Sequence, residues 1–249
     1  MMLDDKVAVI YGAGGSIGGA VARTFAKKGA RVFLAGRTQT TLEEVAEDIR
    51  SDGGEADTAV VDALDDQAVD KFVDAVVEET GRIDISFNLI GIGDVQEPLT
   101  ELSVEDFVQP ITIAMRTQFL TTRAAARYMI ERESGVILTF GGSNPDAPPG
   151  TGGFKVALDA IEGLRRQWAV ELGPHGIRVV TLKTGSVPES IPDDVEYRDE
   201  IAAATKEATL LGRAATLADV GDVAAFVASE QARTITATEV NISCGAIME

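Results

Sequence analysis

The chain is 249 residues long and carries 22 lysines and arginines against 40 aspartates and glutamates, a formal net charge of −18. This acidic balance argues against nucleic acid and anionic membrane as partners, and the length suits one α/β domain over residues 1–249. One cysteine, Cys244, and one histidine, His175, exclude an internal disulfide and make a Cys or His metal site implausible. No run of about 18 or more apolar residues and no signal-peptide pattern is present, so we expect a cytoplasmic protein.

Apolar strand-like runs alternate with helical periods along the chain. Strands are expected over residues 6–11, 31–35, 57–61, 84–89, 135–140, 177–182 and 238–242. Helices are expected over residues 16–28, 40–51, 66–80, 107–132, 154–173 and 217–229. Pro110 would damage a helix interior, so we place it in the first turn after the start at Ser103. The alternation predicts a Rossmann-like, doubly wound parallel sheet of about seven strands flanked by helices.

A glycine turn joins the first strand to the first helix. Residues 12–18 read Gly-Ala-Gly-Gly-Ser-Ile-Gly and follow the apolar run that ends at Tyr11. Glycines let backbone N–H groups approach pyrophosphate oxygens, and the positive end of the following helix dipole faces the anion. This unit predicts a site for the phosphates of a dinucleotide.

Two irregular segments follow strand ends, where ligands bind in open α/β sheets. Residues 141–153 contain three prolines and five glycines, too many for regular structure. Residues 183–206 are acidic and contain proline, which predicts a mobile flap over the site.

The glycines at positions 12, 14, 15 and 18 resemble the Thr-Gly-x-x-x-Gly-x-Gly signature of the short-chain dehydrogenase/reductase family. Tyr11 stands for the threonine and Ser16 for the middle glycine. Further family-like stretches cover essentially the whole chain. The resemblance implies a cofactor site formed by Gly12, Gly14, Ser16, Ile17, Gly18, Arg37, Thr38, Asp62, Ala63, Asn88, Gly91, Lys155, Gly185 and Val187.

The resemblance also implies a preference for NADPH/NADP. An acidic residue after the second strand would bind the ribose hydroxyls of NAD, but Gly36 stands there and Arg37 and Thr38 follow. Such a pair resembles members of the family that hold the 2′-phosphate of NADP with a guanidinium group. Asp62 matches the family's adenine-binding aspartate, and Asn88 matches the asparagine that stabilises the central strand.

The catalytic positions depart from the family pattern. The family uses a Tyr-x-x-x-Lys pair in which the tyrosine is the general acid; Lys155 matches the lysine, but Thr151 replaces the tyrosine. An aliphatic hydroxyl has a pKa far above the value of about 10 of tyrosine, so Thr151 can orient a carbonyl but is a poor proton donor. The family's serine position falls on Gly142, with Ser143 beside it, and Ala114 stands at the helix asparagine.

The candidate catalytic residues are therefore Lys155, Thr151 and Ser143. Among the three tyrosines, Tyr11, Tyr128 and Tyr197, only the last lies in the flap, from which it could swing in. Some enoyl reductases of the family place a small hydroxyl residue four positions before the lysine, which makes a conjugated C=C bond a reasonable target.

Three functions remain open. The first is an NADPH-dependent reductase with an unusual acid that acts on a small carbonyl compound or an activated alkene. The second is a catalytically impaired homologue that binds the dinucleotide as a sensor, regulator or scaffold. The third is a cofactor-free lyase or dehalogenase on the same fold, against which the retained cofactor residues argue.

We also expect a homotetramer or a dimer. The family pairs its long fourth helix across a twofold axis, and the predicted helix over residues 107–132 is rich in apolar side chains. Those side chains are Ile111, Met115, Phe119, Leu120, Tyr128 and Met129.

Overall fold

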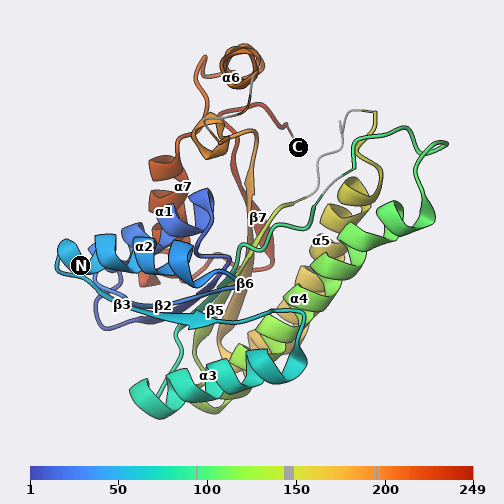
Figure 1. Cartoon of the computed structure of the whole chain (residues 1–249). Coiled ribbons are helices and arrows are strands. Elements are labelled where there is room, and N and C mark those ends of the chain that lie inside the picture. Colours follow the sequence, from blue (N-terminus) through green and yellow to red (C-terminus); the bar gives the residue numbers. More distant parts are fainter. Residues whose placement is uncertain (94, 143–148, 193–194, 196, 249) are drawn as a thin grey trace.

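The computed structural model describes residues 1–249 except 94, 143–148, 193–194, 196 and 249. The strands are β1 (Val7–Tyr11), β2 (Arg31–Gly36), β3 (Glu55–Val60), β4 (Ile85–Asn88), β5 (Gly135–Phe140), β6 (Ile177–Thr184) and β7 (Thr238–Ile242). The helices are α1 (Ser16–Lys27), α2 (Gln39–Ser51), α3 (Asp66–Thr80), α4 (Val104–Arg132), α5 (Gly152–Leu172), α6 (Arg198–Glu207) and α7 (Leu217–Ala228). The strands form one parallel sheet in the order β3-β2-β1-β4-β5-β6-β7 (Figure 1). The predicted Rossmann-like, doubly wound sheet is confirmed, with its order reversing between β1 and β4.

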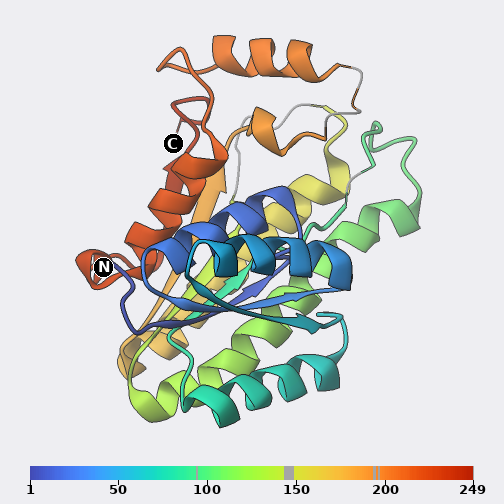
Figure 2. The same ribbon diagram turned by 60° about the vertical axis from the view of Figure 1, so that its left-hand side comes forward.

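Helices cover both faces of the sheet (Figure 2). Helices α1, α2 and α7 pack on one face, where Phe25 and Val220 are fully buried. Helices α3, α4 and α5 pack on the other face, where Phe72 lies in the core. Neighbouring strand residues point to opposite faces of the sheet. Ile10 of β1 packs in the core on the side of α1, α2 and α7, and Val9 packs in the core on the side of α3, α4 and α5. The strands are buried on both faces, which explains their continuous apolar sequences.

Short polar side chains set the starts of several helices. The Asp65 carboxylate accepts from the backbone N–H groups of the first turn of α3. The Ser103 hydroxyl does the same at α4, and Thr216 and Asp219 form a reciprocal capping box at α7.

Pro110 lies in the interior of α4, so the prediction that it occupies the first turn is wrong. The helix begins at Val104, directly after its Ser103 cap, and not at the expected residue 107. A Cβ atom on Gly153 of α5 would lie 2.9 Å from Pro110 Cγ and 2.3 Å from the carbonyl oxygen of Phe107. The glycine therefore allows α5 to pack closely against the turn of α4 that contains the proline.

The apolar side chains of α4 are mostly used inside the protein. Leu120 and Met129, two of the apolar side chains cited for an assembly, are buried in the core beside α3 and β5. Tyr128 donates a hydrogen bond of 2.7 Å to the Asp74 carboxylate of α3, which helps to raise the pKa of its phenol. Phe119 remains 43% exposed and stacks on Trp168 of α5.

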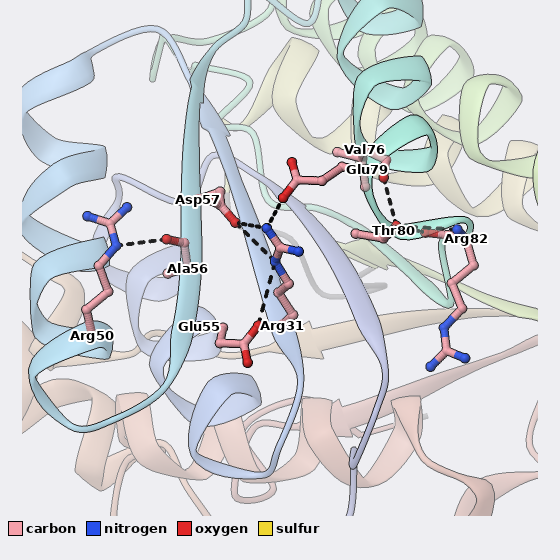
Figure 3. A network of polar contacts seen from close by, with 9 residues as sticks. All are labelled: Arg31, Arg50, Glu55, Ala56, Asp57, Val76, Glu79, Thr80 and Arg82. Carbon is pink, nitrogen blue, oxygen red and sulfur yellow. Dashed lines mark hydrogen bonds and ion pairs between the residues drawn. The ribbon is translucent and has the colours of Figure 1, made fainter.

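An ionic network joins β2, β3 and α3 near the amino-terminal ends of the strands (Figure 3). The Arg31 guanidinium donates to Asp57, at 2.8 Å from Nη2, and to Glu79, while Glu55 lies 3.8 Å from its Nε. The hydrogen bond to Asp57 is the main cause of the raised pKa of Arg31. These contacts lie at the opposite end of the strands from the glycine turn.

Helix α6 was not predicted from the sequence, because its acidic residues and its three consecutive alanines show no apolar face. It buries none of its residues and lies at one end of the molecule, outside the helical layers (Figures 1 and 2). Among the described residues, no helix has both the length and the apolar character needed to cross a membrane.

Candidate functional site

The glycine turn between β1 and α1 has a conformation that side chains would prevent. Gly12 has φ +77°, and a Cβ atom there would lie 2.5 Å from the carbonyl oxygen of Leu89. A Cβ atom on Gly18 would lie 2.2 Å from the carbonyl oxygen of Gly12. The turn thus brings the start of α1 against the end of β4, and the helix N-terminus is aimed along the carboxyl edge of the sheet.

A cavity of about 480 Å³, here called the nucleotide cavity, lies beside this turn. Seven of the predicted cofactor residues line it: Gly12, Gly14, Arg37, Thr38, Asp62, Ala63 and Gly91. Arg37 and Thr38 are exposed at its rim, and Arg37 has no hydrogen bond or ion pair to any residue that the structure describes. The cavity therefore combines a glycine cradle with a cation that has no partner in the described part of the chain.

Asn88 lies at the end of β4 and supports the cavity wall without lining it. The buried Asn88 side chain donates from Nδ2 to the Thr121 hydroxyl at 3.1 Å, and its Oδ1 accepts from the N–H of Ile90 at 3.0 Å. These bonds fix the segment that leads to Gly91. The predicted stabilising role of Asn88 agrees with these contacts.

A second cavity of about 790 Å³, here called the inner cavity, adjoins the first. Leu89, Ile90 and Gly91 line both cavities, so one elongated ligand can extend from one into the other. The inner cavity is also lined by the predicted residues Ile17, Thr151, Lys155 and Gly185. Its remaining walls are mainly apolar, with Phe140, Phe154, Leu158 and Ile161 among them.

Besides Asn88 and Gly18, two predicted cofactor residues lie outside the walls of both cavities. Ser16 is the first residue of α1, and its hydroxyl donates to the carbonyl oxygen of Ser190 at 3.4 Å. Val187 is buried and packs in the core under α7.

Lys155 and Thr151 lie on the first turn of α5 and face the inner cavity. Thr151 is half-buried at the N-cap position, and its carbonyl oxygen accepts from the backbone N–H of Lys155 at 2.9 Å. The Lys155 ammonium forms an ion pair with Asp159, one turn further along the helix. Ser143, the third predicted catalytic residue, lies outside the described residues.

Gly142 forms part of the inner cavity wall and leaves no room for a side chain. It has φ +95°, and a Cβ atom would lie 2.8 Å from Cβ and Cδ of Lys183 and 2.9 Å from Oε2 of Glu239. Lys183 and Glu239 form an ion pair of 2.7 Å between Nζ and Oε2. The space that a serine side chain would need at position 142 is thus filled by this pair.

The pair belongs to a larger buried set of charges. Arg165 donates to Glu162 at 2.8 Å, and the Thr181 hydroxyl links Glu162 to Thr139. Burial raises the pKa of Glu162, whose carboxyl also shares a hydrogen bond with Glu239. Burial also acts to raise the pKa of Glu239, but its bonds to Lys183 and Glu162 outweigh burial and lower it.

Sequence reasoning missed Lys183, Glu239 and the buried Gln118. A signal was available for the first two, since each is a charged residue inside a largely apolar or neutral strand. Gln118 of α4 lines the inner cavity, and its position among buried threonines and alanines was the corresponding signal.

None of the three tyrosines faces the inner cavity. Tyr11 lies beneath the nucleotide cavity, and burial raises the pKa of its phenol far above the usual value. Tyr128 is bonded to Asp74, and Tyr197 is 59% exposed at the start of α6. Among the described residues, no cluster of His, Cys, Asp and Glu suits a metal ion.

Comparison with known proteins agrees with this geometry. The model of the enoyl-(acyl carrier protein) reductase family matches residues 12–246. The chain belongs to the short-chain dehydrogenase/reductase family. It is 30% identical to the uncharacterized oxidoreductase YxbG of Bacillus subtilis, covering 98% of this chain and 91% of that protein. It is 29% identical to the meso-2,3-butanediol dehydrogenase of Serratia marcescens, covering 99% of this chain and 96% of that protein.

A crystal structure of NAD+-bound xylitol dehydrogenase has a TM-score of 0.88 and 26% identity, covering 98% of this chain and all of that one. Membership of the short-chain dehydrogenase/reductase family makes the chain an oxidoreductase of the short-chain type. It also implies that a nicotinamide cofactor binds to this fold, and the glycine cradle beside the nucleotide cavity suits such a cofactor.

Proposed function

We propose that the protein is an NADP(H)-dependent reductase with an atypical active site, acting on a small carbonyl compound or a conjugated enoyl compound. The observation that carries the cofactor assignment is Arg37 at the rim of the nucleotide cavity. It follows Gly36, so no carboxylate is present to bind the ribose hydroxyls, and it has no partner among the described residues. A guanidinium group in this position suits the 2′-phosphate of NADP.

The chain's own residues supply binding and orientation. Gly12 and Gly18 leave room for the pyrophosphate, Asp62 suits the adenine amino group, and Lys155 suits the nicotinamide ribose. The bound cofactor would provide the hydride. Thr151 can hold a carbonyl oxygen by a hydrogen bond but cannot act as a strong acid. This limitation favours a conjugated enoyl substrate over a simple ketone.

The alternative is a catalytically impaired homologue that binds NADP(H) as a sensor, regulator or scaffold. Two observations favour it. The Lys183–Glu239 pair leaves no space for a serine at position 142, and Lys155 is held by Asp159.

The cofactor assignment is tested by calorimetric titration with NADPH and NADH. One charge-assisted contact of about 1.5–3 kcal/mol predicts that NADPH binds at least roughly tenfold more tightly. Arg37→Ala should remove this preference and leave NADH binding unchanged. Arg233→Ala, which removes an exposed arginine far from both cavities, is the matched control. Equal affinities in the unmodified protein would contradict the assignment.

The reaction is tested with NADPH against conjugated enoyl thioesters and simple ketones. Enoyl turnover that disappears in Lys155→Ala would support the reductase, whereas NADPH binding without turnover of any acceptor would favour the sensor. Robust ketone reduction would refute the reasoning about Thr151.

We also propose a homodimer or homotetramer, located in the cytoplasm. The support for the assembly is apolar surface on adjacent helices: Phe119 on α4, and Val156 and Val170 on α5, are 43%, 42% and 72% exposed. Burial of these side chains against a second copy would remove them from water.

A further inference from the structure

Gln118 presents an unpartnered carboxamide to the inner cavity. Its side chain is 5% exposed, and its Oε1 atom is buried without a hydrogen-bond partner among the described residues. Its Nε2 atom has no hydrogen bond to the described residues either. Gln118 lines the same cavity as Thr151 and Lys155.

Two buried polar neighbours of Gln118 on α4, Thr117 and Thr121, are bonded to other groups. The Thr117 hydroxyl donates to the Ala114 carbonyl at 3.4 Å, and Thr121 donates to the Thr117 carbonyl at 2.8 Å while accepting from Asn88. These contacts hold the helix and the end of β4. The amide of Gln118 therefore differs from these two hydroxyls, which serve the fold.

An unpaired buried amide lowers stability relative to a paired one. Such a group is retained without a protein partner where a ligand or an ordered water completes its hydrogen bonds. The inner cavity is large, mainly apolar and shares Leu89, Ile90 and Gly91 with the nucleotide cavity. A small number of polar groups in such a cavity fix the orientation of the ligand.

We propose that Gln118 binds the carbonyl oxygen of the substrate, together with the Thr151 hydroxyl. This proposal rests on the reductase function and names one residue that recognises its substrate class. The amide Nε2–H groups donate to the carbonyl oxygen of the substrate.

The same contact assists the reaction. Hydride addition to a carbonyl carbon, or to the β-carbon of an enoyl group, moves the π electron pair onto the carbonyl oxygen. The Nε2–H donor stabilises that negative charge in a cavity that contains few other donors. Gln118 transfers no proton; water supplies the proton that completes the product.

Gln118→Met tests this role because methionine has a similar length and no amide. Ligand-free Gln118→Met should unfold a few degrees above the unmodified protein, because an unpaired polar group has been removed. Its affinity for NADPH should be unchanged. With crotonyl-CoA and NADPH, kcat/KM should fall by about 10²- to 10³-fold, the usual effect of removing one donor to a developing oxyanion. Gln109→Met, at an exposed position of the same helix, should change none of these quantities.

A binding measurement separates this proposal from the reductase function. The side-chain amide resonance of Gln118 is identified by its absence from the nitrogen–proton NMR spectrum of Gln118→Met. It should shift when crotonyl-CoA or cyclohexanone is added, with or without NADP, and this requires no turnover. A lower unfolding temperature in Gln118→Met, or an amide resonance that neither probe moves, would overturn the proposal. A shifted amide in a protein without preference for NADPH would refute the cofactor assignment alone.

Discussion

Replacing Gly142 by serine should destabilise the protein instead of restoring a catalytic hydroxyl. The φ of +95° is unfavourable for a residue with a Cβ atom, at about 1–2 kcal/mol. The new Cβ atom would lie 2.8 Å from two carbons of Lys183 and 2.9 Å from Glu239 Oε2. Overpacking of this kind costs about 1–3 kcal/mol. Together the two effects predict a loss of roughly 2–5 kcal/mol.

Urea denaturation at neutral pH measures this loss, and a thermal melt should show a decrease on the order of 10 °C. Gly163→Ser is the control, because a Cβ atom at this exposed position of α5 would have no neighbour within 4 Å. The control should be as stable as the unmodified protein, or slightly more so, since serine has the higher helix propensity. If Gly142→Ser melts within about 2 °C of the unmodified protein, the Lys183–Glu239 pair moves aside easily and the reasoning fails.

Three further predictions concern other parts of the molecule. Asp159→Asn should raise the affinity for NADPH by a few-fold in a fluorescence titration, because the asparagine no longer forms an ion pair with Lys155. Asp222→Asn, which removes the partner of Lys28, is the control. An unchanged affinity in Asp159→Asn would show that its ion pair with Lys155 does not compete with the cofactor. Asp219, whose pKa is lowered to about 2 by Arg213 and the backbone of Thr216, contributes stability above its usual pKa of 3.8 and loses it as the pH falls towards 2. The free energy of unfolding of Asp219→Asn at pH 7 should therefore be about 0.5–1 kcal/mol lower than that of the unmodified protein. In urea titrations this difference should shrink between about pH 4 and pH 2. A difference that stays constant with pH would contradict the role of the charge. Val170→Glu should shift the protein towards the monomer in light scattering. Val104→Glu should not, although both valines are 72% exposed. A monomeric unmodified protein would refute the assembly.

Local sequence patterns were sufficient for most of the fold. The strand and helix positions follow from apolar periodicity, and the glycines at 12 and 18 have the close backbone contacts that their spacing predicted. Errors occurred where tertiary packing decides the outcome. Gly153 of α5 packs closely against Pro110 inside α4, and no pattern near residue 110 reveals that contact.

The composition of the candidate site was only partly predictable. Arg37, Asp62 and Gly91 come together at one cavity because parallel strands end at the same edge of the sheet. The sequence also placed Lys155 and Thr151 on one helix turn. It did not indicate that Lys183 and Glu239, on different strands, occupy the space beside Gly142, since cross-strand neighbours depend on the sheet register. Nor did it indicate that the Gln118 amide lacks a hydrogen-bond partner among the residues that the structure describes.

The Lys183–Glu239 pair also constrains how this active site can change during evolution. A serine at position 142 requires the removal of both charged side chains, and substitutions arise one at a time. Loss of Lys183 leaves the largely buried Glu239 carboxylate without this cation, at about 3–5 kcal/mol. A single-step order that begins at Lys183 therefore passes through an intermediate that has lost much of the stability of a typical domain. In a lineage that carries this ion pair, substitutions at residues 118 and 151 can change the active site more easily than a return to serine at position 142.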